Sequence, residues 1–178
     1  MRIPHRRLLA PLVLASLATL GGGPDPGLLL EVDLAAFRLE ARDLGDAAAG
    51  PTLRVAVGSP SHPTPRGEFR PRRVVNNPRW TPGPHARSLG ARPLPPSSDG
   101  PLGAGKMPLT ASGIQIHGGA DPRELGKPVS LGCVRIADES WQELIGWLEE
   151  RDTLEPWALR PEGDAVSEFR RPIRVVVR

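Results

Sequence analysis

The chain contains few of the residues that several common kinds of site require. Its single cysteine, Cys133, has no partner for an internal disulfide bond. There is no tyrosine, and four tryptophans and three phenylalanines leave little aromatic surface for stacking on nucleic-acid bases. Beyond His117 and Cys133, the chain after residue 20 offers only His62 and His85 as nitrogen or sulfur ligands, at spacings unlike those of a zinc site. We therefore expect no metal and no nucleic-acid partner.

Acidic and basic residues balance once the first twenty residues are set aside. The whole chain has a formal net charge of +3, but residues 1–20 contribute three arginines and no acidic residue. A balanced chain does not attract nucleic acid by its charge. One stretch whose only acidic residue is Glu68 nevertheless holds seven arginines: Arg66, Arg70, Arg72, Arg73, Arg79, Arg87 and Arg92. It predicts either a solvated loop face or a surface that attracts the carboxylates of an anionic polymer.

The N-terminal residues 1–20 have the features of a secretory signal peptide. Basic residues precede an apolar run, Leu8–Leu20, which is shorter than the roughly 20 residues of a membrane-spanning helix. A linker rich in glycine and proline, 21–27, follows. We predict an exported protein of the periplasm or cell envelope whose mature form is not transmembrane. A retained N-terminal anchor is the alternative, because no Ala-x-Ala cleavage site is visible.

Residues 28–178 are expected to form one mostly β domain with one packed helix. Alternating apolar residues predict strands at 28–34, 37–42, 53–57, 114–117 and 173–177. The helix is expected to begin at Asp138, whose side chain can cap it, and to bury a stripe from Trp141 to Leu148. Residues 59–112 hold most of the prolines, and so long a loop either lines a site or is poorly ordered.

Cys133 and His117 are the candidates for chemistry. In the strand 114–117 we expect Ile114 and Ile116 to face the core, so that His117 faces the other side, where a ligand can meet it. A thiol with a pKa of about 8.5 needs a base to form thiolate at neutral pH, and a neighbouring histidine can remove the proton. The backbone N–H groups of Gly132 and Cys133 would then stabilise an oxyanion. The alternative is a buried cysteine that serves as a small apolar residue.

The segment from His117 to Arg135 resembles the signature of the L,D-transpeptidase (YkuD-type) catalytic domain. That signature has a His-Gly pair, a loop of similar length, and then Ser-x-Gly-Cys followed by a hydrophobic residue and Arg or Asn. Further segments resemble the family in the same order along the chain: Val55–Gly58, Thr64–Phe69, Asn77–Pro82, Pro101–Gly103 and Leu125–Ser130. The resemblance covers nearly all of residues 28–150. It implies an L,D-transpeptidase-like β-sandwich.

The resemblance also implies a reaction. Cys133 would be the nucleophile and His117 the general base, with no cofactor. The thiol would form an acyl-enzyme thioester with a peptidoglycan tetrapeptide stem, and an amine would resolve it to a cross-link. Transfer to water would instead give carboxypeptidase activity. Carbapenem-type inhibitors are implied as ligands beside the stem peptides.

Three further residues are expected at the substrate: Arg135, Gly132 and Ser130. Arg135 would orient a donor carboxylate or form a structural salt bridge, Ser130 would shape the loop, and Gly132 would give the backbone room.

The chain departs from the family pattern at three places. Leu131 stands where many members have histidine, and Gly119 replaces a threonine or serine. The stretch 148–171 is longer and more charged, as in a lid or a surface insertion. The first two departures leave a second function open, a non-catalytic peptidoglycan-binding module with a decayed site.

Overall fold

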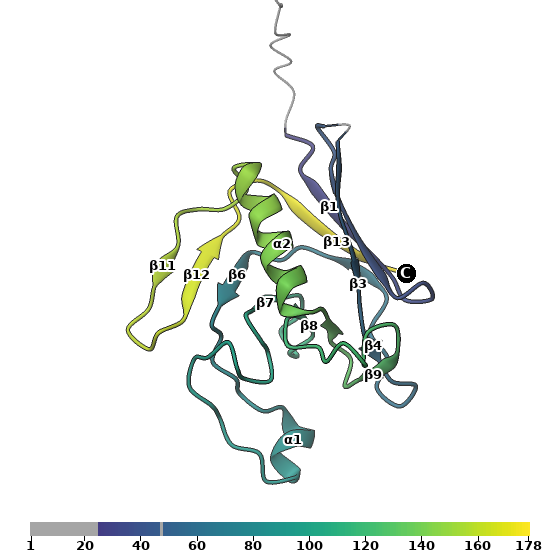
Figure 1. The fold of residues 1–178 in the computed structure, drawn as a ribbon, viewed down its shortest axis with the longest axis vertical. Helices are drawn as coiled ribbons and strands as arrows, with labels where there is room; N and C mark the ends of the chain where they lie inside the picture. The colour runs from purple at the N-terminus through teal and green to yellow at the C-terminus, as the bar shows by residue number, and fades with distance from the viewer. Residues whose placement is uncertain (1–24, 47) are drawn as a thin grey trace, which may run out of the picture.

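The computed structural model describes residues 25–46 and 48–178 of the chain, coloured from purple to yellow in Figure 1. The predicted signal peptide at 1–20 and most of the predicted linker at 21–27 lie outside these residues. No helix among the described residues is long and apolar enough to cross a membrane. The described chain folds around one buried apolar cluster, to which strands of both larger sheets and the long helix contribute.

The first sheet has five strands and contains the first and the last strand of the described chain. Its order is β3 (Ala49–Arg54), β2 (Arg38–Asp43), β1 (Leu28–Asp33), β13 (Ile173–Val177) and β5 (Gly67–Phe69). The pair β1 and β13 is parallel, and the other neighbours are antiparallel. Leu28, Leu30 and Val32 are fully buried, whereas the residues between them are not, which confirms the alternation read from the sequence.

The second sheet has six strands and carries the candidate site. Its order is β10 (Val134–Arg135), β8 (Gln115–His117), β7 (Gly105–Pro108), β6 (Arg73–Asn76), β12 (Ala165–Glu168) and β11 (Ala158–Leu159). A small parallel pair, β4 (Val57–Gly58) and β9 (Pro128–Ser130), completes the strands. The longer segment 148–171 therefore extends this sheet at its far edge through β11 and β12.

The strand predicted at 53–57 is wrong in its extent. β3 ends at Arg54, and Ala56 pairs with Arg135 at the edge of the second sheet. Val57 then pairs with Pro128 in the small sheet. The apolar alternation continues through this crossing because Val55, Ala56 and Val57 are buried on the way.

The long helix α2 (Asp138–Glu150) lies where it was predicted. Trp141, Leu144, Ile145 and Leu148 are buried, and in Figure 1 the helix runs between β12 and β6 on one side and β1, β3 and β13 on the other. The Trp141 ring lies against Gly105, where a Cβ atom would come within 2.1 Å of the ring. Glycine is required there for the helix to approach β7.

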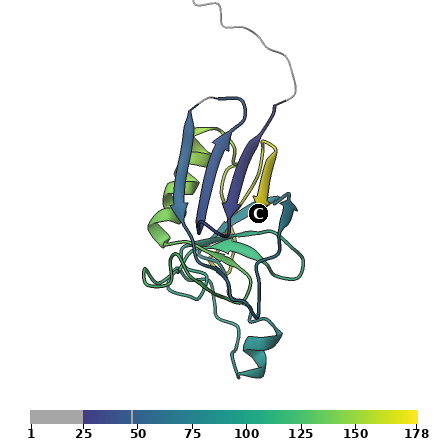
Figure 2. The ribbon, with the colours of Figure 1, turned by 90° about the vertical axis from the view of Figure 1, so that its right-hand side faces the viewer.

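The prediction of one packed helix is confirmed by α2, whereas the 59–112 stretch contains more regular structure than the long loop expected there. This stretch contains β5, β6 and β7 and a short helix, α1 (Pro84–Ser88), which projects at the lower end of the molecule in Figure 2. Pro84 at the start of α1 fixes a helical φ, and no residue of α1 is buried. The helix therefore has no apolar stripe from which it could be predicted.

Asp138 does not cap α2 as expected. The N-cap residue is Ala137, and no side chain bonds to the first turn. Instead, Asp138 Oδ1 accepts hydrogen bonds from the backbone N–H groups of Ala104, at 2.7 Å, and Gly119, at 2.9 Å. One carboxylate thus joins the start of the helix to the loop before β7 and to the loop after β8. Gly119, in the second of these loops, lies two residues after His117.

We expect the Asp138→Ala variant to lose about 2 kcal/mol of unfolding free energy, because two backbone donors lose a charged acceptor. Asp138→Asn keeps a side-chain oxygen at this position and should lose less. Urea unfolding of both variants measures the difference. Equal midpoints for the alanine and asparagine variants would contradict the role assigned to this oxygen.

Candidate active site

Cys133 and His117 line one cavity of about 350 Å³. Its walls come from segments far apart in the sequence, including Trp80, Leu102 and Ile114. Helix α1 contributes Pro84, His85 and Ala86, and His62 also lines the cavity. The proline-rich stretch 59–112 therefore lines the site, which was one of the two alternatives predicted for it.

Parallel pairing of β8 with β10 places the two candidate residues in adjacent segments that line the same cavity. Ile116 pairs with Val134 and His117 pairs with Arg135, so Cys133 enters β10 beside the start of β8. The thiol is half-buried, and its Sγ lies 3.7 Å from the carbonyl oxygen of Gly113, to which it donates. The cysteine is therefore open to the cavity and is more than a core residue.

His117 is buried, with 4% of its surface exposed. Its Nδ1 lies 2.7 Å from the carbonyl oxygen of Gly118. A carbonyl oxygen only accepts, so Nδ1 carries the hydrogen and Nε2 keeps its lone pair. This bond leaves Nε2 as the ring nitrogen that is able to accept a proton.

Burial favours the neutral forms of both groups. It lowers the pKa of His117 to about 4, and the positive charges of Arg135 and Lys106 act in the same direction. Burial also raises the pKa of the Cys133 thiol, against the backbone N–H of Gln115 and the charge of Arg135, which lower it. Both shifts favour a thiol beside a neutral imidazole over a thiolate beside an imidazolium.

The lowered pKa of His117 predicts a loss of stability in mild acid. Between its ordinary pKa of 6.5 and the folded value of about 4, the unfolded chain binds a proton that the folded chain does not. Stability is therefore complete above pH 6.5 and falls as the pH drops through this window, by about 2 kcal/mol between pH 7 and pH 5. Urea unfolding of the wild type and of His117→Gln at both pH values isolates this contribution. If both proteins lose the same free energy, His117 is not the group responsible.

The loop before Cys133 is held by Ser130. The Ser130 hydroxyl is fully buried, donates to the carbonyl oxygen of Cys133 at 2.6 Å and accepts from the N–H of Gly132 at 3.1 Å. Ser130 lies outside the cavity lining, so it shapes the loop, and the substrate contact considered for it is wrong. The N–H of Gly132 is occupied by this bond, so of the two N–H groups predicted to stabilise an oxyanion only that of Cys133 remains a candidate.

Gly132 has the conformational role predicted for it. Its φ is +107°, and a Cβ atom there would lie 2.9 Å from Cδ1 of Ile114. The expectation that Ile114 points into the core is wrong. β8 begins only at Gln115, and the Ile114 side chain is half-buried and lines the cavity.

Arg135 forms the salt bridge that was one of its two predicted roles. Its Nη1 lies 3.1 Å from Oε2 of Glu124. The side chain is partly exposed and also lines the cavity. Its Nε is buried and has no hydrogen-bond partner among the described residues. The guanidinium group is therefore held at the edge of the cavity, with donor capacity to spare.

Residues 28–167 match the family model of the YkuD L,D-transpeptidase catalytic domain. The chain belongs to this L,D-transpeptidase family. A relative from Fuscovulum blasticum, named as an L,D-transpeptidase of the ATP synthase subunits region, is 37% identical over 84 residues. The L,D-transpeptidase YkuD of Bacillus licheniformis is 33% identical over 116 residues. These matches cover 46% and 65% of this chain, and 44% and 51% of the relatives, so the chain spans about half their length.

Solved structures of L,D-transpeptidases share the fold. L,D-transpeptidase 3 from Mycobacterium tuberculosis gives a TM-score of 0.55 at 15% identity, with 85% of this chain and 61% of that chain covered. The catalytic domain from E. faecium, acylated by ertapenem, gives 0.55 at 19% identity, with 85% and 97% covered. The predicted L,D-transpeptidase-like, mostly β fold is thereby confirmed.

Two departures from the L,D-transpeptidase pattern are now located. Leu131 is 49% exposed and lines the cavity, so an aliphatic side chain stands near the thiol where many members carry an imidazole. Gly119 has a φ of +72°, a conformation that favours glycine over the usual hydroxyl residue. Its N–H donates to Asp138, which secures the segment after His117 without a hydroxyl group.

His62 and His85 were considered in the sequence only as metal ligands. Their ring centres lie 5.7 Å apart, and both rings line the L,D-transpeptidase cavity. Across the part of the chain that the structure describes, no three metal-ligating side chains gather at one point. The pairing depends on how α1 lies against the 59–62 segment, so no local pattern could have shown it.

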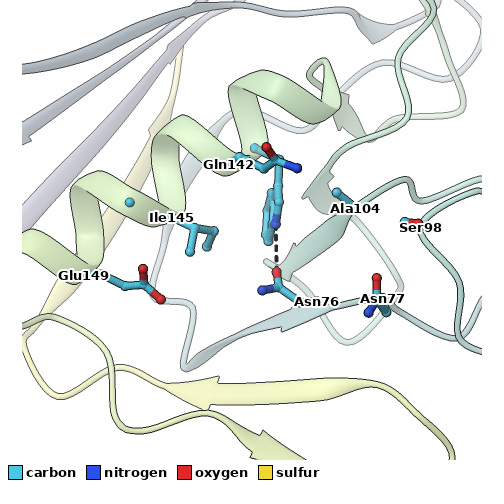
Figure 3. A pocket seen from close by; sticks show the side chains of 9 residues that line it. Asn76, Asn77, Ser98, Ala104, Gln142, Ile145 and Glu149 are labelled. Carbon is cyan, nitrogen blue, oxygen red and sulfur yellow. Dashed lines mark hydrogen bonds between the residues drawn. The ribbon is translucent and has the colours of Figure 1, made fainter.

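A separate pocket of about 490 Å³ lies beside α2 (Figure 3). The indole Nε1 of Trp141 donates to Oδ1 of Asn76 at 2.9 Å, and Gln142 and Glu149 reach the pocket from the helix. It shares no lining residue with the cavity of Cys133. The hydrogen bond links α2 to β6. This pocket is therefore separate from the candidate active site.

Proposed function

We propose that the protein is an exported cysteine L,D-transpeptidase that acts on peptidoglycan stem peptides in the cell envelope. The observation that carries this proposal is a cavity lined by both a half-buried thiol, just before β10, and an oriented imidazole on the neighbouring parallel strand β8. The family supplies the substrate class, a tetrapeptide stem with a diamino acid followed by D-Ala.

The first half-reaction forms a thioester. Sγ of Cys133 attacks the carbonyl carbon before D-Ala while Nε2 of His117 takes the thiol proton. The N–H of Cys133 donates to the oxyanion that develops. The carbon–nitrogen bond then breaks, and His117 returns the proton to the amine of the departing D-Ala. Proton transfer during attack suits a resting pair that is neutral.

The second half-reaction releases the acyl group. An acceptor amine attacks the thioester carbon and gives a proton to His117, which passes it to the departing sulfur. A new amide bond replaces the carbon–sulfur bond, and the product is a cross-link between stems. Arg135, at the edge of the cavity, is the candidate to orient a donor carboxylate.

Acylated relatives support the proposal of a covalent intermediate. Among the solved structures that share the fold are an E. faecium L,D-transpeptidase domain acylated by ertapenem and an M. tuberculosis L,D-transpeptidase in complex with a faropenem-derived adduct. By analogy, carbapenem-type compounds are proposed to acylate Cys133. The partly exposed thiol in an open cavity supports this reaction.

Incubation with disaccharide-tetrapeptide tests the proposed function. Chromatography with mass detection should find a cross-linked dimer and free D-Ala. Protein whose thiol has been alkylated beforehand is the control and should give neither. Tripeptide in place of dimer would mean that water is the acceptor. Unchanged substrate that still binds would favour the non-catalytic binding module, for which the site with Leu131 beside the thiol is the structural argument.

A further inference from the structure

A second concavity of about 450 Å³ collects positive charge from three parts of the chain. Arg73 lies on β6, Arg79 follows β6, Lys106 lies on β7, and Arg160 lies in the turn between β11 and β12. We call these four residues the basic pocket. Two of the seven arginines in the arginine-rich stretch contribute to it, whereas others of that stretch bind locally, as Arg70 does to Glu68.

The basic pocket adjoins the cavity of Cys133 on one face of the six-stranded sheet. Lys106 is the register partner of His117 between β7 and β8, and cross-strand partners present their side chains on the same face. Thr81 lines both the basic pocket and the cavity. A peptide lying in the cavity therefore has a short path into the basic pocket.

The positive charge of the basic pocket is only partly neutralised. Glu162 and Asp164 also line it, and Asp164 pairs with Arg160 at 3.5 Å. The ammonium group of Lys106 contacts the carbonyl oxygen of Arg79 at 3.4 Å. Between residues 25 and 178, position 47 aside, no ion pair to a carboxylate is formed by Lys106, Arg73 or Arg79.

The burial and charge of Lys106 indicate which kind of ligand the basic pocket favours. Its side chain is half-buried, and burial lowers its pKa; the carboxylate of Asp164 opposes this shift, and the charges of Arg73 and Arg160 add to it. An anion beside it would relieve that cost. Four cationic side chains and two carboxylates give the basic pocket a formal net charge of about +2. A charge of this size suits a ligand with one carboxylate better than a polyanion. Arginine forks bind carboxylates through two hydrogen bonds.

We propose that the basic pocket binds a carboxylate of the peptide that reacts at Cys133. This inference rests on the proposed function and adds a specificity determinant to it. It also gives the longer 148–171 segment a purpose, because Arg160 is carried by the turn between its two strands.

Binding measurements separate this inference from the chemistry. In a Cys133→Ala background, which cannot turn over, the dissociation constant is measured by calorimetry for disaccharide-tetrapeptide. The same peptide with its carboxylates amidated is the matched ligand. Arg160→Gln and Arg73→Gln are the test variants. Arg38→Gln, on β2 of the other sheet, is the control.

We expect each test variant to weaken binding of the carboxylate peptide about tenfold, the usual scale for one charge-assisted contact. Binding of the amidated peptide should be the same in the test variants and in the control. Equal dissociation constants in all variants would overturn the inference, and so would equal weakening toward both peptides. Neither result depends on turnover. Failure of this inference therefore leaves the proposed function untouched, because that function is tested by product formation.

Discussion

Replacing Cys133 by alanine is expected to abolish the formation of both cross-linked dimer and tripeptide, by at least about 10³-fold. The thiol is the only sulfur nucleophile in the chain, and it faces the cavity that His117 also lines. Without it, no thioester forms and neither acceptor can complete the reaction. The same variant should take up no carbapenem, as seen by intact-protein mass spectrometry.

Leu131→Ala is the matched control for this variant. Leu131 lies two residues from the thiol and lines the same cavity, but it has no place in the proton transfers. We expect it to retain most of its turnover and to form the carbapenem adduct. Turnover by correctly folded Cys133→Ala at the wild-type rate would contradict the assignment of the nucleophile.

The second large effect is expected for His117→Gln, which should lower turnover by about 10²- to 10⁴-fold. Glutamine fills the buried site and can still donate to the Gly118 carbonyl oxygen, but it cannot accept the thiol proton. The loss should appear in kcat and in kcat/KM alike, because the proton moves in the transition state of each half-reaction.

The pH dependence of thiol alkylation separates two roles for this histidine. The structure predicts a neutral resting pair, so the alkylation midpoint should lie above the ordinary thiol pKa and should move little in His117→Gln. A midpoint that rises by a unit or more in the variant would instead indicate a resting ion pair. Unchanged turnover in His117→Gln would remove this residue from the mechanism.

Strands in which every second residue is apolar and buried could be predicted from the sequence. Leu28, Leu30 and Val32 are one such set, and β1 forms there. The segment 53–57 has the same alternation, yet it crosses between sheets, because burial of alternate residues does not specify which neighbour pairs with them. Helix α1 is short, exposed and started by a proline, so it leaves no helical period in the sequence.

The candidate site divides in the same way. Cys133 and His117 were predicted because the motif is local to the loop and strands that hold them. The carboxylate of Asp138 was expected at its own helix, but tertiary packing presents it to the N–H groups of Ala104 and Gly119. The basic pocket unites Lys106 with Arg160 across 54 positions, a relation that only the order of strands in the sheet creates.

Peptide mapping after a short incubation with isotope-labelled tetrapeptide tests the central claim most directly. The account predicts an adduct whose mass equals the substrate without D-Ala, held as a thioester on the fragment that contains Cys133. Hydroxylamine should release it. An adduct on another residue, or dimer formation with no acyl group ever held by the protein, would contradict acyl transfer through this thiol.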